Sequence, residues 1–336
     1  MIALLLAALQ DPIIEPVKPN TRVEGASLWL FAVDDGTARV AVSAENTRSL
    51  LIGRLDLDDS RPRPSWQEAA GARDTEGLSI ADHWHVFAHD HHWLSFSTGP
   101  AQVSYLVKLD KDFRRIGLWK VADHEKASDT AHRGGLPTND HFLIAEPEGV
   151  AVGHFLPGHG HRVFRFDKSG RLQGKIDVGG GKFRHSNGSS VLATESGYQI
   201  LATEFLNFVQ QGGVLFLDTD RDWNPKSARL ALDEERKNIA MASGVRLPTG
   251  HLILNAKVCS NAYPRGQRPP PPPKEQKGLA PDDGSIVRYV LSPEGKVLGK
   301  TLLAERGCRP HTLLRGDLLI TTWDGAGLTV RVDRIR

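Results

Sequence analysis

The sequence of 336 residues has almost no helical periodicity. Apolar residues rarely recur at the spacing of an amphipathic helix, and the only helix-like stretch is the short run 231–238. This scarcity excludes a fold built mainly on helices. Short β-rich runs alternate instead with Gly, Asp, Asn and Pro along the chain, which is typical of an all-β sandwich, barrel or propeller.

Cysteine, long apolar runs and an excess of charge are also lacking. The only cysteines, Cys259 and Cys308, allow at most one disulfide bond, and the alternative is two unpaired core residues. No run approaches the ~18–20 apolar residues of a membrane-spanning helix, so no membrane span is expected. The 42 Lys and Arg nearly balance the 40 Asp and Glu, so no surface for nucleic acid is expected.

The first residues, MIALLLAALQDP, form an apolar run that ends in small residues and then turns polar. This pattern resembles the apolar centre and cleavage zone of a secretory signal, although no basic residue precedes the run. We therefore expect residues 1–12 to be a signal-like segment and the protein to be extracytoplasmic, either periplasmic or secreted. The alternative is an apolar N-terminal strand or tail.

The most informative feature that is present is an internal repeat. Residues 82–110 and 140–167 both open with Asp-His-aromatic, pass through two apolar stretches and a Gly turn, and close on a strand that ends in Asp. A repeat on this scale is typical of a supersecondary unit stacked on copies of itself. His83 and His141 occupy matched positions in the two copies.

The repeat predicts one β-propeller domain over residues 20–336. We expect six blades of four antiparallel strands, closed by pairing of the N- and C-terminal strands, or seven blades if residues 20–75 hold more than one. An insertion at 259–284 contains the run Pro269 to Pro273. It is expected to be an extended loop that docks a partner, forms a lid or is simply solvated. The third strands are expected to end near Asp56, Asp110, Asp167, Asp218, Ser292 and Asp333.

Two segments, 134–145 and 243–256, share a Leu-Pro-Thr turn before an apolar strand. This phrase resembles one that is common in six-bladed propellers of the NHL and arylsulfotransferase-like kind. The resemblance implies the architecture and transfers no activity. It would make 141–145 the second strand of its unit, whereas the Asp-His repeat makes it the first.

Polar residues at the start of the innermost strands of a propeller converge on its axis. We expect four histidines there as ligands of a divalent transition metal (Zn, Cu or Fe), because neutral imidazole suits these ions. Three of them, His83, His141 and His185, are also the expected catalytic residues, and an open metal position would supply a Lewis acid or an activated water. The alternative for each is a structural histidine that bonds the backbone of a neighbouring blade. The four expected metal ligands are His83, His141, His185 and His311.

Further polar and aromatic residues are expected near the inner strands. They would bind an anionic or sugar-like ligand, with Trp323 as a stacking platform, and the alternative is salt bridges and packing. The expected substrate-binding residues are Arg184, Glu204, Lys257 and Trp323.

Two further motifs are expected to be turns. The run 218–222 resembles the opening of a Ca²⁺ loop, but Trp223 stands where Gly is needed and Arg229 where Glu is needed. This departure favours a turn held by Asp side chains. Residues 89–92 are expected in a turn on the face of the disc opposite His83.

Three functions compete. The first is an exported metal-dependent lyase or hydrolase that acts on a polar or carbohydrate-like substrate. The second is a non-catalytic binding module for a protein or glycan. The third is a metal-free enzyme that uses one histidine as acid or base, as the resemblance to arylsulfotransferase-like propellers would imply. A small-molecule or glycan ligand is the expected partner, and the sequence indicates no oligomeric state.

Overall fold

All regular elements that the structure describes are β-strands. The structure is a computed structural model, and it describes residues 11–23, 27–32, 39–45, 48–56, 64–99, 103–123, 141–156, 160–179, 190–206, 209–232, 238–259, 284–325 and 327–336. Within these ranges no helix is long and apolar enough to cross a lipid bilayer.

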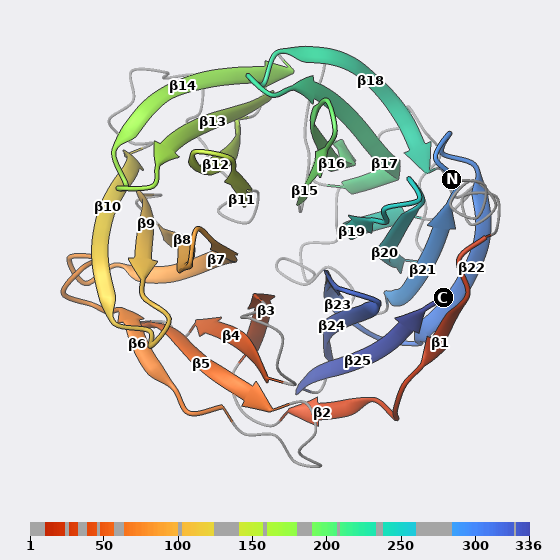
Figure 1. The fold of residues 1–336 in the computed structure, drawn as a ribbon, viewed down its shortest axis with the longest axis horizontal. Coiled ribbons are helices and arrows are strands. Elements are labelled where there is room, and N and C mark those ends of the chain that lie inside the picture. Colours follow the sequence, from red (N-terminus) through yellow and green to blue (C-terminus); the bar gives the residue numbers. More distant parts are fainter. Residues whose placement is uncertain are drawn as a thin grey trace, which may run out of the picture.

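The strands form antiparallel sheets, five with four strands and one with five, arranged like a fan around a central axis (Figure 1). The innermost strands contact one another in chain order, and the last contacts the first, so the ring is closed. This arrangement is an all-β propeller, as the repeat predicted. The innermost strands are β3 (Ser27–Ala32), β7 (Ser79–Ala88), β11 (His141–Glu146), β15 (Ser190–Thr194), β19 (Asn238–Arg246) and β23 (Cys308–Arg315).

The other strands follow outward in sequence order in five sheets, and in the last sheet β1 and β2 lie outside β25. The second strands are β4 (Arg39–Glu45), β8 (His91–Gly99), β12 (Gly149–Leu156), β16 (Gly197–Leu206), β20 (Leu252–Cys259) and β24 (Leu318–Gly325). The third strands are β5 (Leu50–Asp56), β9 (Val103–Leu109), β13 (Gly160–Asp167), β17 (Val209–Asp220), β21 (Ser285–Leu291) and β25 (Gly327–Ile335). The outermost strands are β6 (Gln67–Ala70), β10 (Arg115–Asp123), β14 (Leu172–Gly179), β18 (Pro225–Leu232), β22 (Val297–Ala304), β1 (Ile14–Pro16) and β2 (Thr21–Val23).

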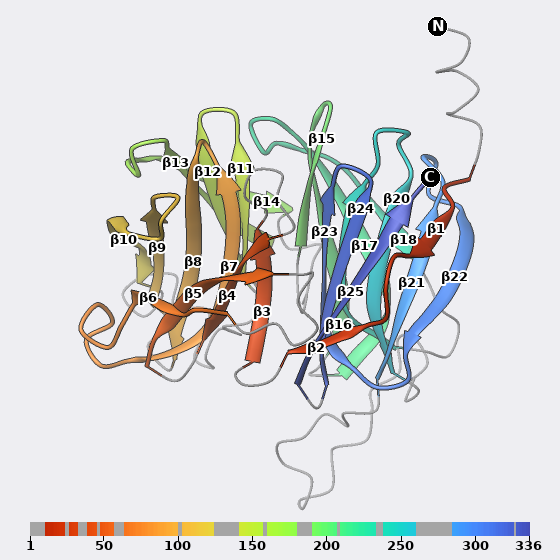
Figure 2. The ribbon, with the colours of Figure 1, turned by 60° about the horizontal axis from the view of Figure 1, so that its bottom comes forward.

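The two ends of the chain meet in the last sheet. Strands β1 and β2 both pair with β25, with Ile14 opposite Ile335 and Thr21 opposite Val330. Figure 2 shows them running along the outside of this sheet. The predicted pairing of N- and C-terminal strands is therefore confirmed. Ile14 also packs against an apolar cluster that includes Leu319, which anchors the N-terminal strand by side-chain burial as well as by its ladder.

Each strand presents side chains to both neighbouring sheets, because successive Cβ atoms point to opposite faces. Leu50 and Ile52 of β5 pack with Leu94 and Phe96 of β8, so one cluster fills the space between the first two sheets. Phe142 of β11 belongs to a second cluster, which fills the space between the sheets of β11 and β16. The core is thus divided among the spaces between sheets.

One turn recurs between third and fourth strands. Asp110, Asp167 and Asp220 each accept, on Oδ1, hydrogen bonds from the backbone N–H groups two and four residues later. Ser292 makes the corresponding bond from the Lys296 N–H to its hydroxyl. The fourth residue of each turn has a positive φ: Phe113 (65°), Gly170 (86°), Trp223 (67°) and Gly295 (91°).

This recurrence confirms the Asp-held turn and corrects one predicted strand end. Asp220, and not Asp218, is the residue equivalent to Asp110 and Asp167. Asp218 lies inside β17 and accepts hydrogen bonds from Gln199 and Ser227. The sequence could not separate the two carboxylates because both stand near the end of the same apolar run.

Three further expectations are corrected or bounded. Residues 141–146 are the first strand of their sheet, whereas 252–259 are the second, so the shared Leu-Pro-Thr phrase does not mark equivalent places. The helix-like run 231–238 begins in β18 and ends in β19. Most of the insertion at 259–284, and residues 1–10 of the signal-like segment, lie outside the described residues.

Candidate functional site

The innermost hairpins set the register of the predicted histidines. The last pair of the β7–β8 hairpin is Ala88 with His91, and that of the β11–β12 hairpin is Glu146 with Gly149. His83 and His141 each lie five residues before the end of their strand. They are therefore equivalent, as the repeat predicted.

His311 does not match them. The β23–β24 hairpin closes with Arg315 paired to Leu318, so His311 lies four residues before the strand end and is equivalent to Trp84. An odd difference in register places a side chain on the opposite face of its strand. The expectation of matched histidines is wrong for His311, because this residue lies one position nearer to its hairpin than His83 and His141 do.

The opposite registers bring His83 and His311 toward the same place. β7 and β23 both contact β3, which stands between them in the ring. His83 also influences His311 electrostatically and contributes to lowering the pKa of that ring. The Trp84 ring meets His311 edge to face, with ring centroids 5.8 Å apart and planes at 82°. Two strands separated by more than two hundred residues thus meet near the axis.

His311 is uncharged at neutral pH. Burial, with a smaller contribution from His83, lowers the pKa of His311 to about 4. Burial also lowers the pKa of His85 well below its ordinary value, with smaller contributions from His92, His83 and His311. A neutral imidazole has a free lone pair for a metal ion or a proton.

His141 contacts the backbone of the preceding sheet and the ring of His154. Its Nε2 lies 3.4 Å from the Ser95 carbonyl oxygen of the preceding sheet, and its ring stacks on His154 with centroids 5.6 Å apart. This contact with a neighbouring backbone is the structural alternative given for such histidines. Within the described ranges, no three His, Cys, Asp or Glu side chains lie together where they could hold a metal ion. Arg184 and His185 lie outside these ranges, so a metal site that includes His185 stays a prediction.

The remaining predicted residues are placed as follows. Glu204 lies in β16 at a register shift between Thr203 and Phe205. Lys257 is 6% exposed, with Nζ 3.4 Å from Cys308 Sγ. Trp323 is 3% exposed and packs in a cluster with Ile286 and Leu303, which is a packing role and not a stacking platform. Cys259 and Cys308 are both free thiols, so the disulfide option is wrong.

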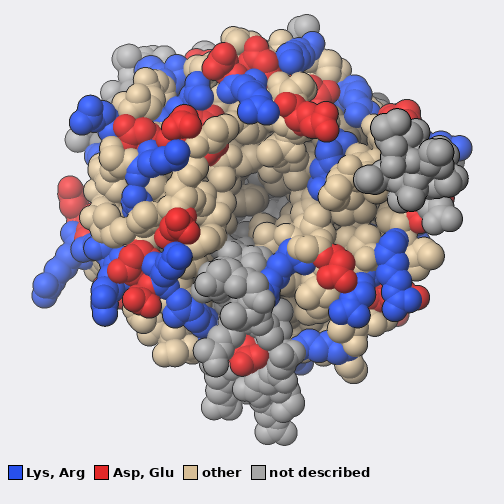
Figure 3. Space-filling model, viewed as in Figure 1, with Lys and Arg blue, Asp and Glu red and all other residues tan. Residues whose placement is uncertain are grey.

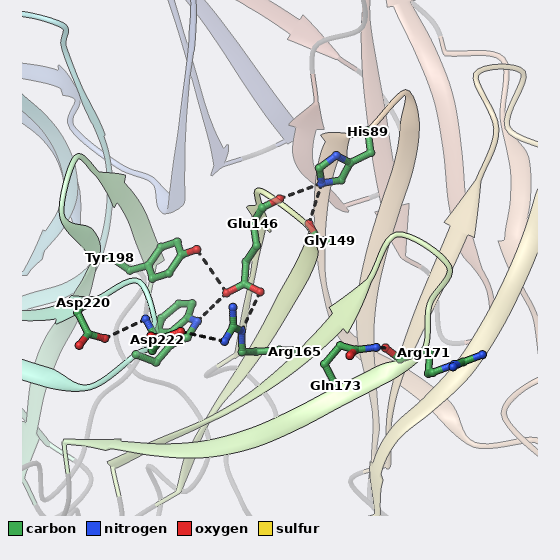
Figure 4. Close-up of polar contacts among 10 residues, drawn as sticks. His89, Glu146, Gly149, Arg165, Arg171, Gln173, Tyr198, Asp220 and Asp222 are labelled. Atoms are coloured by element: carbon green, nitrogen blue, oxygen red, sulfur yellow. Dashed lines mark hydrogen bonds and ion pairs between the residues drawn. The ribbon is translucent and has the colours of Figure 1, made fainter.

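The sequence analysis missed a buried carboxylate, Glu146, at the end of β11 (Figure 4). Its Oε1 accepts hydrogen bonds from Trp223 Nε1 (2.8 Å) and the Tyr198 hydroxyl (3.3 Å), and its Oε2 accepts one from Arg165 Nε (3.1 Å). Burial and the neighbouring Glu146 raise the pKa of Tyr198 to about 12. Both oxygens are engaged with side chains of the protein, so this cluster joins sheets and is not a free catalytic acid.

The histidines of the β7–β8 turn belong to the same side of the disc as Glu146. His89 and Asp90 have positive φ values of 53° and 61° and form the tip of the hairpin. His89 Nε2 lies 2.8 Å from the Glu146 carbonyl oxygen and 3.1 Å from that of Gly149. The predicted turn is confirmed for residues 89–90, whereas His91 and His92 lie in β8. His89 ties the second sheet to the third.

The surface supports a site at the axis. Viewed along the axis, the molecule is hollowed at its centre, and uncharged residues border much of the hollow (Figure 3). Lys, Arg, Asp and Glu side chains lie interspersed around it, with no broad region of one sign on this face. Such a surface suits a neutral polar ligand better than a polyanion.

The comparisons with known proteins show the fold. No protein-family model matches the chain, and no curated protein is similar to it in sequence. A subtype N10 neuraminidase-like protein of A/little yellow-shouldered bat/Guatemala/060/2010 is similar in structure, with a TM-score of 0.57, 10% identity, and 96% of this chain and 98% of that one covered.

Two further structures are similar. A GH43 β1,3-galactosidase with galactodeoxynojirimycin has a TM-score of 0.52 and 11% identity over 87% of this chain and 99% of that one. A DUF4221 family member from Bacteroides vulgatus has a TM-score of 0.52 and 10% identity over 97% of both chains. The propeller fold of this chain is thus shared with proteins of glycosidase and neuraminidase-like description, and such identities show the fold alone.

Proposed function

We propose that this chain is an exported propeller enzyme with a ligand site on its axis, a metal-dependent lyase or hydrolase of polar, carbohydrate-like substrates. The observation that carries the proposal is the contact of Trp84 with His311, from strands more than two hundred residues apart, together with the electrostatic effect of His83 on His311. Convergence of distant strands on one axis is how propellers assemble a site. The export rests on the apolar N-terminal run.

The architecture of the proposal has six blades. Each sheet is taken as one blade, and the last is completed at its rim by β1 and β2. The unbroken circuit of contacts among the innermost strands supports this count. In this arrangement β7 and β23 flank the single inner strand β3, which accounts for their histidines lying together.

Two residues at the axis could serve as ligands of the proposed metal ion. His83 and His311 are imidazole donors of the kind that Zn, Cu and Fe bind, and the pKa of about 4 keeps His311 unprotonated. A third donor must come from outside the described residues, and His185 is the candidate. A bound ion would supply a Lewis acid or an activated water.

Trp84 gives the site its preference for a sugar-like ligand. It is partly buried, at the edge of the apolar clusters between sheets, and it replaces Trp323 as the aromatic platform. An indole ring combines an apolar face with a polar edge, which suits the mixed surface of a pyranose ring. The shared fold with the galactosidase agrees with this class of substrate, while the argument rests on the axial residues.

Elemental analysis of protein expressed with Zn, Cu and Fe tests the metal. We expect one ion per chain in the wild type, and a loss of at least tenfold in occupancy in both His83→Ala and His311→Ala. His91→Ala, at the β7–β8 hairpin, is the matched control and should retain the ion. Occupancy that survives both axial substitutions would exclude this metal site.

A glycan array and a screen of glycoside cleavage test the ligand class. Binding that is lost in Trp84→Ala, together with turnover that is lost in His311→Ala, is the expected result. Binding without turnover, with no stoichiometric metal, would favour the non-catalytic binding module over the enzyme. A metal-free protein with turnover that depends on one histidine would favour acid–base chemistry by that residue.

A further inference from the structure

Lys257 and Cys308 form an isolated pair at the boundary between the sheets of β20 and β23. Lys257 Nζ lies 3.4 Å from Cys308 Sγ, and within the described residues this is the one hydrogen bond of either side chain. Lys257 is 6% exposed and forms no ion pair with a described carboxylate. A buried lysine is ordinarily paired with an opposite charge, so a thiol as its one partner among the described residues is unusual.

The backbone near Lys257 and Cys308 leaves room for the lysine side chain. The Lys257 side chain runs across Gly284, where an added Cβ would lie within 3.0 Å of Cγ, Cδ and Cε. Gly284 in turn accepts a hydrogen bond from the Gly307 N–H at 2.9 Å, immediately before Cys308. Any larger residue at Gly284 would displace the lysine, so this segment directs Nζ toward the sulfur.

We propose that Lys257 and Cys308 are an oxidation-dependent cross-linking site that joins the last two sheets. Cys308 is only partly buried, so a small peroxide can reach the sulfur, whereas Lys257 is held beside it. A nucleophile held at this distance reacts as at a very high effective concentration, provided that it can adopt the attacking geometry. The co-reactant is hydrogen peroxide, and the product is a sulfenamide.

The reaction has two balanced steps. In the first, the Cys308 thiol becomes a sulfenic acid (S–OH), and one peroxide molecule is reduced to one water. In the second, the Lys257 nitrogen attacks Sγ through its lone pair, the S–N bond forms and the S–O bond breaks. The departing hydroxide takes a proton from the nitrogen and leaves as a second water. The protein loses two hydrogen atoms in total, and a thiol reductant reverses the link.

Peptide mapping of the intact chain tests the proposal. After treatment with dilute hydrogen peroxide, we expect a peptide containing Lys257 linked to one containing Cys308, lighter by two hydrogen atoms and separated by dithiothreitol. The Cys259→Ser background removes the competing thiol and should leave the link unchanged. The melting temperature of the linked protein should rise by about 5 °C, because the link constrains the unfolded chain.

Lys257→Arg is the matched variant, since it keeps a long basic side chain at this position and removes the nucleophilic amine. We expect Cys308 in this variant to stop at the sulfenic acid, detected by dimedone, or to proceed to sulfinic acid. A Cys259–Cys308 disulfide in the wild type would overturn the proposal. So would a link that persists in Lys257→Arg, or a Cys308 that peroxide leaves unmodified.

Discussion

Arg288 Nη1 lies 2.7 Å from Asp333 Oδ2, and the two side chains are 3% and 0% exposed. The remaining bonds of the guanidinium go to Asn255 Oδ1 (3.0 Å) and Thr321 Oγ1 (2.8 Å), while Arg331 Nε reaches both oxygens of Asp333 at 2.9 Å. The cluster joins β20 and β21 to the sheet that receives the N-terminal strands. It therefore stabilises the ring where the chain closes on itself.

We expect Asp333→Asn to lower the free energy of unfolding by about 3–5 kcal/mol, because it leaves Arg288 buried without its carboxylate. Urea unfolding followed by circular dichroism measures the change. The control is Asp317→Asn, whose partner Arg334 is about half exposed, and an exposed pair of this kind contributes less than about 1 kcal/mol. Equal effects of the two substitutions would contradict the role given to the buried pair.

Glu146→Ala should also destabilise the protein, by about 2–4 kcal/mol, because the buried indole of Trp223 and the Tyr198 hydroxyl lose their acceptor. The near-ultraviolet circular dichroism of these stacked rings, whose centroids are 4.1 Å apart, should change with it. Glu148→Ala is the control, since Glu148 is 89% exposed and pairs only with Lys168 in the described contacts. An unchanged midpoint in Glu146→Ala would mean that the carboxylate does not join the sheets.

The fold was predictable because the repeat of its sheets is visible in short stretches of the sequence. The repeat of Asp, histidine and aromatic residues identified His83 and His141 as equivalent, and the two hairpins confirm this pairing. Turn residues at the ends of third strands gave the spacing of the sheets. These signals depend on a few neighbouring residues, so one sequence contains them.

The site was less predictable because it depends on register and closure. His311 lies one residue nearer to its hairpin than His83 does, which places it on the other face of its strand, and the sequence does not mark where the hairpin turns. Glu146 is 77 residues from Trp223 in sequence, and the two meet only because neighbouring sheets pack face to face. Trp323 was expected at the axis, but a large aromatic side chain fills the space between sheets equally well.

Acid should destabilise the protein below pH 6.5. Burial lowers the pKa of His92 and His311 to about 4 and that of His161 to about 3, all below the value of 6.5 in an unfolded chain. In the folded state these groups resist protonation, whereas the unfolded state takes up protons as the pH falls through 6.5. Stability is therefore full above that pH and is lost on acidification.

Each such histidine contributes a slope of about 1.4 kcal/mol per pH unit between pH 6.5 and 5. Urea unfolding at pH 7.5, 6.5, 5.75 and 5 measures the summed slope before most carboxylates titrate. His161 lies beside Phe142, and His161→Phe should reduce the slope by about 1.4 kcal/mol per pH unit, the contribution of one histidine. A free energy of unfolding that stays flat over this window would show that these rings are solvated.

Gly153 of β12 lies where an added side chain would meet a buried aromatic ring. An added Cβ would lie within 2.5 Å of three atoms of the Phe142 ring, which is 0% exposed and packed against the next sheet. Because the ring is enclosed, it has nowhere to move, and Gly153→Ala should cost about 1–3 kcal/mol or more by overpacking.

The control is Gly174→Ala in β14, where an added Cβ meets nothing within 4 Å. Replacing this glycine removes freedom from the unfolded chain, so the variant should be stabilised by roughly 0.5 kcal/mol. Thermal unfolding of both variants beside the wild type gives the comparison. The two substitutions add the same methyl group to strands of one sheet, so opposite signs would locate the constraint in the contact between Gly153 and Phe142. Similar losses in both would instead attribute the effect to the strand backbone.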